Sequence, residues 1–94
     1  MIDTIRAKKT EILSLAAKSG LKDVRIFGSV ARGEDDGNSD VDMLVNVADA
    51  SDPFAFIDFQ EAVSILLNTR VDLVFERGLY HGIREAILKE ARPL

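Results

Sequence analysis

The chain has 94 residues, of which 47% are hydrophobic, and it carries a formal net charge of −4. This length and balance predict one folded domain spanning residues 1–94 and exclude a disordered tail. The absence of cysteine excludes a disulfide framework, a thiolate zinc site and a cysteine nucleophile, while the acidic charge argues against stable binding of nucleic acid.

The first half of the chain is predicted to form a helix followed by two strands. Apolar residues recur at helical spacing over residues 3–19, and Gly20 is a typical helix stop. A strand is expected over residues 23–27, a helical turn over residues 30–33 and a second strand over residues 40–47. The two strands thus flank a turn-rich, acidic segment.

The second half is predicted to add a helix, a strand and a last short helix. Asp52 and Pro53 are typical of a helix start, and apolar residues at helical spacing continue that helix over residues 54–67. A nearly all-apolar third strand is expected over residues 71–75, and the last helix over residues 83–91. This order predicts a small α/β fold in which helices cover a sheet.

No part of the sequence predicts a membrane segment. No apolar run approaches the roughly 18 residues that a membrane span requires. The first residues begin on charge and lack the apolar core of a signal peptide. We therefore expect a cytoplasmic protein.

Three aspartates fall in the predicted strands. Asp40 and Asp42 are two positions apart, so in a strand they point to the same face with Cα atoms about 6–7 Å apart. They form either an exposed strand end or a cation site, because carboxylate oxygens are the ligands that hard cations prefer. Asp72 lies in an apolar strand, where burial of an isolated carboxylate would be costly. If the second and third strands are neighbours, the three acids can meet and serve a two-metal mechanism.

A Gly-Ser pair ends the first strand. Gly28 permits a sharp turn, and the backbone amides from Ser29 onward can then face a phosphate. Most Gly-Ser pairs after a strand are plain turns, so this pair alone does not decide between the two roles.

Two familiar ligand-binding motifs are excluded by spacing. A P-loop requires lysine and then serine or threonine where this chain has Glu34 and Asp35. An EF-hand loop requires glycine and glutamate where this chain has Val41 and Val47. The acidic segment therefore belongs to neither motif.

Taken together, these residues resemble the pattern of the DNA polymerase beta-like nucleotidyltransferase superfamily. The matching segments are Gly28-Ser29, Arg32-Gly33, Ser39-Asp40-Val41-Asp42 and, on a later strand, Asp72. More narrowly, the chain resembles the minimal nucleotidyltransferases, which are antitoxin partners in prokaryotic two-protein modules. The resemblance extends over essentially the whole chain. It implies a small nucleotidyltransferase fold, a mixed sheet flanked by helices in the order α-β-α-β-α-β-α.

The resemblance also implies roles for the motif residues. Gly28 and Ser29 would hold the β- and γ-phosphates of ATP, the nucleotide donor, and Asp40 and Asp42 would bind two Mg²⁺ ions. Asp72 would share the catalytic metal and help remove the proton of the attacking hydroxyl. The reaction would be in-line attack on the α-phosphorus with loss of pyrophosphate.

Two further residues of the motif have less definite roles. Arg32 either counters the charge of a phosphate or is simply solvated at the surface. Ser39 either caps the acidic turn or takes part in the chemistry.

The sequence ends soon after the third acid, and we expect no acceptor-recognition domain of the kind that larger relatives carry. The resemblance implies an acceptor on another protein, a HEPN-domain toxin, with AMP transferred to a hydroxyl group, that of a tyrosine in particular. Two alternatives stay open: an antitoxin that acts by binding alone, and nucleotide transfer to a small molecule or RNA.

Overall fold

A computed structural model describes residues 1–34, 36 and 40–94. Ser39 and the neighbouring loop positions 37 and 38, predicted from the sequence to form part of an acidic turn, lie outside the described residues. No helix in the described part of the chain is both long enough and apolar enough to cross a membrane.

The described strands form one mixed sheet. Along the sheet their order is β3-β2-β1-β4. Their bounds are β1 Leu21–Phe27, β2 Val41–Val47, β3 Val71–Phe75 and β4 Arg92–Pro93. β1 runs antiparallel to both β2 and β4, whereas β2 and β3 are parallel. This arrangement confirms the α/β class and the mixed sheet that the resemblance implied.

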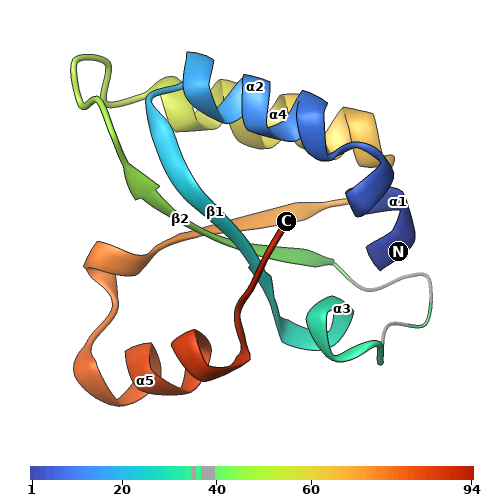
Figure 1. Ribbon diagram of the computed structural model, residues 1–94. Helices are drawn as coiled ribbons and strands as arrows, with labels where there is room; N and C mark the ends of the chain where they lie inside the picture. The colour runs from blue at the N-terminus through green and yellow to red at the C-terminus, as the bar shows by residue number, and fades with distance from the viewer. Residues whose placement is uncertain (35, 37–39) are drawn as a thin grey trace.

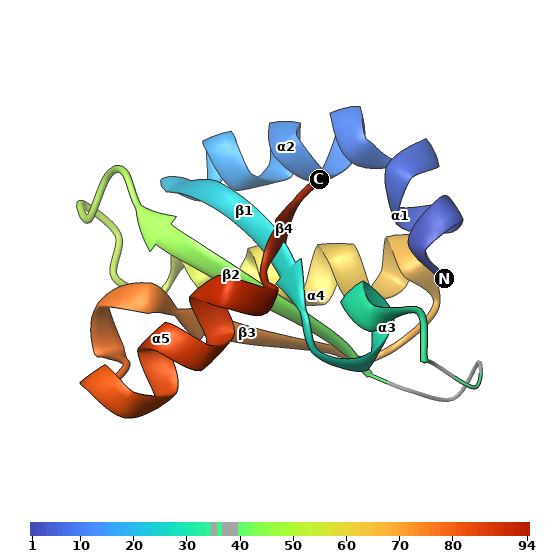
Figure 2. The same cartoon turned by 60° about the horizontal axis from the view of Figure 1, so that its bottom comes forward.

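Helices lie on both faces of the sheet (Figure 1). α2 (Lys9–Lys18) and α4 (Ala55–Leu67) lie on one face of the sheet. The short α1 (Ile2–Ala7) comes directly before α2 in the chain. α3 (Gly28–Arg32) and α5 (His81–Glu90) lie on the opposite side, which we call the open face and which comes forward in Figure 2. A 3₁₀ turn, η1 (Glu76–Gly78), joins β3 to α5.

The core lies between the sheet and α1, α2 and α4. Successive side chains of a strand point to opposite faces, and in β2 the residues Val41, Met43 and Val45 are fully buried in this core. α4 contributes the fully buried Phe59. The same alternation directs Asp42, which lies between two core residues, to the open face. Packing of the hydrophobic face therefore fixes where the carboxylate points.

The predicted helix over residues 3–19 is instead two helices. The chain breaks at Lys8, which has φ −102° and ψ 11° and whose backbone N–H is shared between the carbonyls of Thr4 and Ile5. Each helix still places a fully buried residue in the core, Ile5 from α1 and Ile12 from α2. No glycine or proline marks this break, so the sequence pattern gave no sign of it.

Other boundaries differ by a few residues. β1 begins at Leu21, with an irregularity at Asp23, where φ is 53°. Asp52 Oδ1 accepts the backbone N–H of Phe54 at 3.0 Å, as a capping residue does, although the α-helix itself begins at residue 55. β4 was not predicted, and its Pro93 suits an edge strand because proline lacks an N–H to donate.

Candidate active site

Two aspartates lie side by side on the open face. Asp42 and Asp72 are register partners on the parallel strands β2 and β3. Their neighbours Val41 and Val71 are buried in the core on the other face, so both carboxylates project away from it. Asp40 immediately precedes β2 and, like Asp42, is half-buried. The sequence-predicted acids are therefore brought to one end of two adjacent strands.

Arg70 lies between two of these acids. Its Nε atom is 3.7 Å from Asp40 Oδ2 and 3.3 Å from Asp72 Oδ1. All three side chains are well exposed, Arg70 at 75%, so each ion pair is weak on its own. Sequence reasoning missed Arg70, although its position directly before β3, two residues from Asp72, is a usable signal.

The charged form of Asp42 is disfavoured by its surroundings. Burial raises its pKa above the ordinary value of 3.8, and the negative charges of Asp72 and Asp40 raise it further. Within the described residues, however, no three acidic or histidine side chains are close enough together to hold one cation as they stand. Arg70 pairs with two of these acids, Asp40 and Asp72. The cluster is thus rich in carboxylate oxygens, and an exposed arginine pairs with two of its three acids.

The Gly-Ser turn packs directly against Asp42. Phe27, the last residue of β1, is the register partner of Asp42, and Gly28 follows it with φ +77°. A Cβ atom at Gly28 would overlap the Asp42 carboxylate, so both the backbone conformation and the available space require glycine. Ser29 is the second residue of α3 and is half-buried. The predicted phosphate turn and the predicted metal strand are therefore in contact.

Arg32 is held by two carboxylates. Its Nε donates to Glu34 Oε2 at 2.6 Å, and its Nη1 donates to Glu90 Oε1 at 2.7 Å. The hydrogen bond to Glu34 is the main reason that the pKa of Arg32 is raised, and the hydrogen bond to Glu90 is the next. The same Glu90 oxygen also accepts the backbone N–H of Gly28. Glu90 lies near the C-terminus of α5, and nothing in the local sequence pattern marks it as part of this site.

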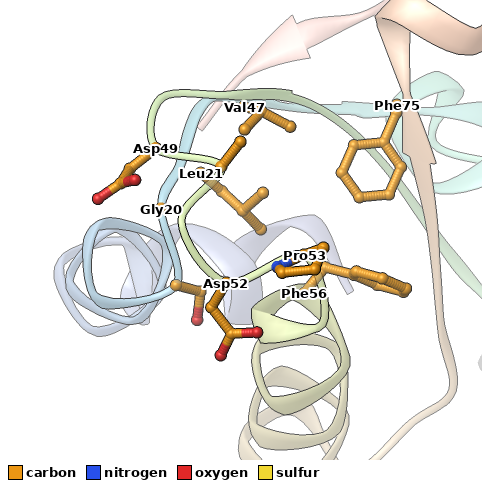
Figure 3. Close-up of a pocket in the computed structure, with 10 residues that line it drawn as sticks. Gly20, Leu21, Val47, Asp49, Asp52, Pro53, Phe56 and Phe75 are labelled. Carbon is orange, nitrogen blue, oxygen red and sulfur yellow. The ribbon is translucent and has the colours of Figure 1, made fainter.

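A separate cavity lies at the far end of the sheet. It has a volume of about 320 Å³ and is bordered by Leu21, where β1 begins, and by Val47 and Phe75, where β2 and β3 end. Phe56 and Phe75 meet edge to face with ring centroids 5.4 Å apart, as Figure 3 shows beside the cavity. Since the aspartates lie where β2 and β3 begin, this mainly apolar cavity is not part of their site.

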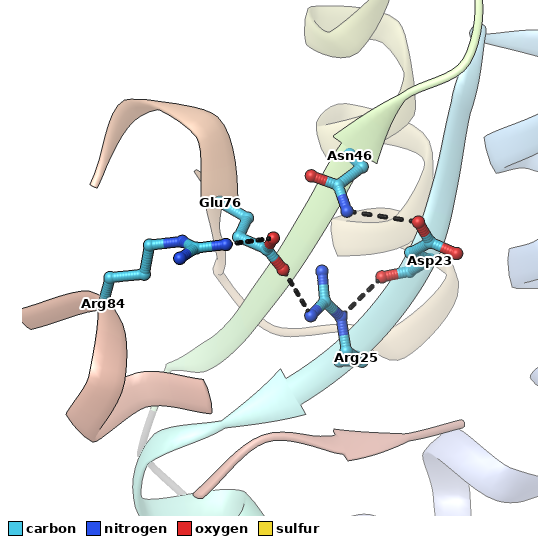
Figure 4. Close-up of polar contacts among 5 residues, drawn as sticks. All are labelled: Asp23, Arg25, Asn46, Glu76 and Arg84. Atoms are coloured by element: carbon cyan, nitrogen blue, oxygen red, sulfur yellow. Dashed lines mark hydrogen bonds and ion pairs between the residues drawn. The ribbon is translucent and has the colours of Figure 1, made fainter. Parts of the chain in front are cut away.

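A second charged cluster occupies the middle of the open face (Figure 4). We call Arg25, Glu76 and Arg84 the arginine–glutamate cluster. Arg25 Nη1 donates to Glu76 Oε1 at 2.6 Å, and Arg84 Nη2 donates to Glu76 Oε2 at 3.2 Å. Arg25 and Glu76 are each 17% exposed. This cluster joins β1, η1 and α5 and lies outside the sequence-predicted site.

Comparison with known proteins identifies relatives of this chain. A family model described as the nucleotidyltransferase domain matches residues 8–94. The chain is 38% identical over 76 residues to the protein adenylyltransferase MntA of Thermococcus cleftensis, covering 81% of this chain and 77% of that protein.

Solved structures show the same fold. One, described as a minimal nucleotidyltransferase, has a TM-score of 0.86 and 44% identity over 98% of this chain and 94% of its own. A toxin–antitoxin structure containing AMP-PNP has a TM-score of 0.74 and 25% identity, covering 90% of this chain and 70% of that one. A third is described as a tri-AMPylated HEPN toxin of Shewanella oneidensis in complex with its MNT antitoxin. At 21% identity, with a TM-score of 0.67 and coverage of 94% and 69%, it shows a likeness of fold alone.

Proposed function

Because this chain belongs to the nucleotidyltransferase family and is an enzyme of that class, we propose that it transfers AMP from ATP to a hydroxyl group of a partner protein. The observation that carries this proposal is the contact between the Gly28 turn and Asp42, with Asp72 in register beside it. The similarity to a protein adenylyltransferase supports a protein acceptor.

The described groups divide into a phosphate side and a metal side. On the phosphate side, the Gly28 backbone N–H and the Arg32 guanidinium already bind an anion, the Glu90 carboxylate, and Ser29 adjoins them. A guanidinium and a backbone N–H both donate strong, charge-assisted hydrogen bonds to phosphate oxygens. We assign them to the triphosphate.

On the metal side, the donor set fits Mg²⁺. Asp40, Asp42 and Asp72 offer the hard oxygen ligands that this ion prefers, and the mutual repulsion that raises the pKa of Asp42 is what a cation relieves. Asp40, Asp42 and Asp72 would hold two Mg²⁺ ions, and the Arg70 side chain would have to move away from Asp40 and Asp72 for the ions to bind. The ions supply charge neutralisation and alignment for phosphoryl transfer.

The remaining chemistry is done by the substrate and by Asp72. The oxygen of the acceptor hydroxyl forms a bond to the α-phosphorus, and the bond from that phosphorus to the oxygen bridging to the β-phosphate breaks. Pyrophosphate leaves, and Asp72 receives the proton of the hydroxyl. Positioning and electrostatics account for most of the rate enhancement in such transfers.

For the acceptor, we propose a tyrosine of a HEPN-type toxin, which the chain neutralises as its antitoxin. The similarity of fold to chains of toxin–antitoxin structures, one solved with AMP-PNP and one containing an AMPylated HEPN toxin, supports this partner. The exposed position of Asp40 and Asp72, at 42% and 39%, is consistent with an acceptor that reaches the site from another chain.

The test is intact-mass measurement of the partner protein after incubation with this chain, ATP and Mg²⁺. We expect the mass of one or more AMP groups on the partner with the wild type, and a loss of at least about a hundredfold in rate with Asp42→Asn. The matched control is Asp58→Asn, because Asp58 is an exposed aspartate on α4. This variant should leave the rate unchanged. An unmodified partner that is nonetheless neutralised equally by the wild type and Asp42→Asn would establish the binding-only alternative instead.

A further inference from the structure

A single carboxylate oxygen engages both groups that we assign to the phosphates. Glu90 Oε1 accepts the backbone N–H of Gly28 and lies 2.7 Å from Arg32 Nη1. The two donors come from the two ends of α3, whereas Glu90 comes from α5, 62 residues after Gly28. The Glu90 side chain is only 29% exposed. The contact therefore closes the phosphate side of the site with a negatively charged group of the chain itself.

The Glu90 carboxylate is close enough to the aspartates to act on Asp42. Its charge is one of those that raise the pKa of Asp42, after Asp72 and Asp40, while Arg32 alone opposes them. A carboxylate so close to other acids is stabilised by charge-assisted hydrogen bonds from an N–H and a guanidinium. A phosphate oxygen would need the same two donors. Gly28 has a single N–H to donate, and the negative charge of Glu90 beside Arg32 would repel a phosphate there, so the two anions compete for this position.

We propose that the Glu90 carboxylate takes the place of a phosphate group in the nucleotide-free enzyme, so that ATP has to displace it and Glu90 sets the affinity for the triphosphate. This inference rests on the proposed function. By the same exchange, Glu90 returns to Gly28 and Arg32 when pyrophosphate leaves, and it therefore weakens the binding of substrate and product alike.

The size of the effect follows from how much of the time the contact is formed. The apparent dissociation constant equals the intrinsic one divided by the fraction of molecules that are open. If the contact is formed in about 80–90% of molecules, removing it tightens ATP binding roughly five- to tenfold. Since Gly28 and Arg32 are assigned to the phosphates, which ATP and pyrophosphate share, pyrophosphate should gain by the same factor.

The test compares the binding of ATP and of pyrophosphate, each with Mg²⁺, by calorimetry. Glu90→Gln keeps the shape of the side chain and removes its charge, and Glu90→Ala removes the acceptor altogether. Glu85→Gln is the matched control, because Glu85 lies on the same helix with its side chain 66% exposed and contacts His81 instead. We expect both Glu90 variants to bind both ligands more tightly than the wild type, and Glu85→Gln to bind as the wild type does.

Two further measurements separate the possible failures. In the nucleotide-free protein, the amide resonance of Gly28 should shift in both Glu90 variants and stay in place in Glu85→Gln. In an Arg32→Gln background, the gain from Glu90→Gln should shrink, since one of the two shared donors is gone. ATP binding and AMP transfer that are normal in the wild type, with equal or weaker ATP binding in both folded Glu90 variants, overturn the role of Glu90 alone. Absence of both ATP binding and AMP transfer from the wild type overturns the proposed function and this inference together.

Discussion

Two charged clusters share the open face of the sheet, and they shift carboxyl pKa values in opposite directions. In the arginine–glutamate cluster, the hydrogen bond from Arg25 is the main reason that the pKa of Glu76 lies below its ordinary value of 4.5. In the aspartate cluster, burial and the neighbouring acids raise the pKa of Asp42. One cluster is therefore at its most stable when charged, whereas the other is strained by its own charge.

The difference lies in the balance of partners. Glu76 receives hydrogen bonds from two arginines, Arg25 and Arg84, as Figure 4 shows, and the pairs link three elements of the fold. Among the described residues, Arg70, which is 75% exposed, pairs with Asp40 and Asp72, and Arg32, which is bound to Glu34 and Glu90, lowers the pKa of Asp42. Clusters of the first kind stabilise a structure, and clusters of the second kind are typical of sites that await a ligand of opposite charge.

Disrupting the arginine–glutamate cluster should have the largest effect on stability. Glu76→Gln leaves the Arg25 guanidinium, 17% exposed, without a charged partner, and a buried group that loses its partner bears its full desolvation cost. We expect the unfolding midpoint to fall by roughly 5–10 °C, measured by thermal unfolding. Glu61→Gln, at an exposed position on α4, is the control. An equal change in the two variants would mean that the cluster has no special structural role.

The opposite change should follow in the aspartate cluster. Asp42→Asn removes a charge that two other aspartates repel, so we expect the midpoint of the metal-free protein to rise by about 2–4 °C. The gain is modest because Asp42 is only half-buried. Added Mg²⁺ should raise the midpoint of the wild type and have less effect on the variant. A lower midpoint in the metal-free variant would contradict the view that this cluster is strained.

The pH dependence of the two effects should have opposite signs. Because the folded-state pKa of Glu76 is lowered, its contribution is present above its unfolded pKa and is lost as the pH falls through the folded one. Because the folded-state pKa of Asp42 is raised, ionisation of this residue destabilises the folded wild type. The destabilisation is absent at low pH and develops as the pH rises through the folded-state pKa of Asp42. Thermal unfolding between about pH 3 and pH 7 should therefore show the Glu76→Gln loss growing with pH and the Asp42→Asn gain growing with pH. Either difference shrinking as the pH rises would contradict the corresponding shift.

Sequence reasoning recovered whatever depends on local pattern. Period-two alternation in β2 and β3 predicted that Asp42 and Asp72 share a face if the strands are neighbours, and the register Asp42–Asp72 confirms that they do. The glycine at residue 28 was predicted as a sharp turn, and its φ of +77° confirms it. The roles of these residues in binding phosphate and metal stay predictions.

Several contacts that the sequence pattern did not reveal join residues far apart in the chain. Arg25 and Glu76 are 51 residues apart, and Gly28 and Glu90 are 62 apart. No spacing rule links such positions, because their meeting depends on how β3, η1 and α5 return across the sheet. β4 was missed for a related reason, since two residues are too few to show a strand pattern and only pairing with β1 defines it.

The smallest predicted effect concerns Arg70. If Arg70 serves as the counter-ion of Asp40 and Asp72 until a cation arrives, then Arg70→Gln removes a competitor of that cation. Exposed ion pairs are weak and screened by salt, so we expect Mg²⁺ to bind only about two- to threefold more tightly, with almost no change in the metal-free unfolding midpoint. Calorimetric titration with Mg²⁺ at low ionic strength measures this, with Arg6→Gln on α1 as the control. Weaker Mg²⁺ binding by Arg70→Gln would mean that Arg70 supports the binding of the cation instead of competing with it. In that case the aspartate cluster, like the arginine–glutamate cluster, would be organised by its arginine rather than strained for want of a cation.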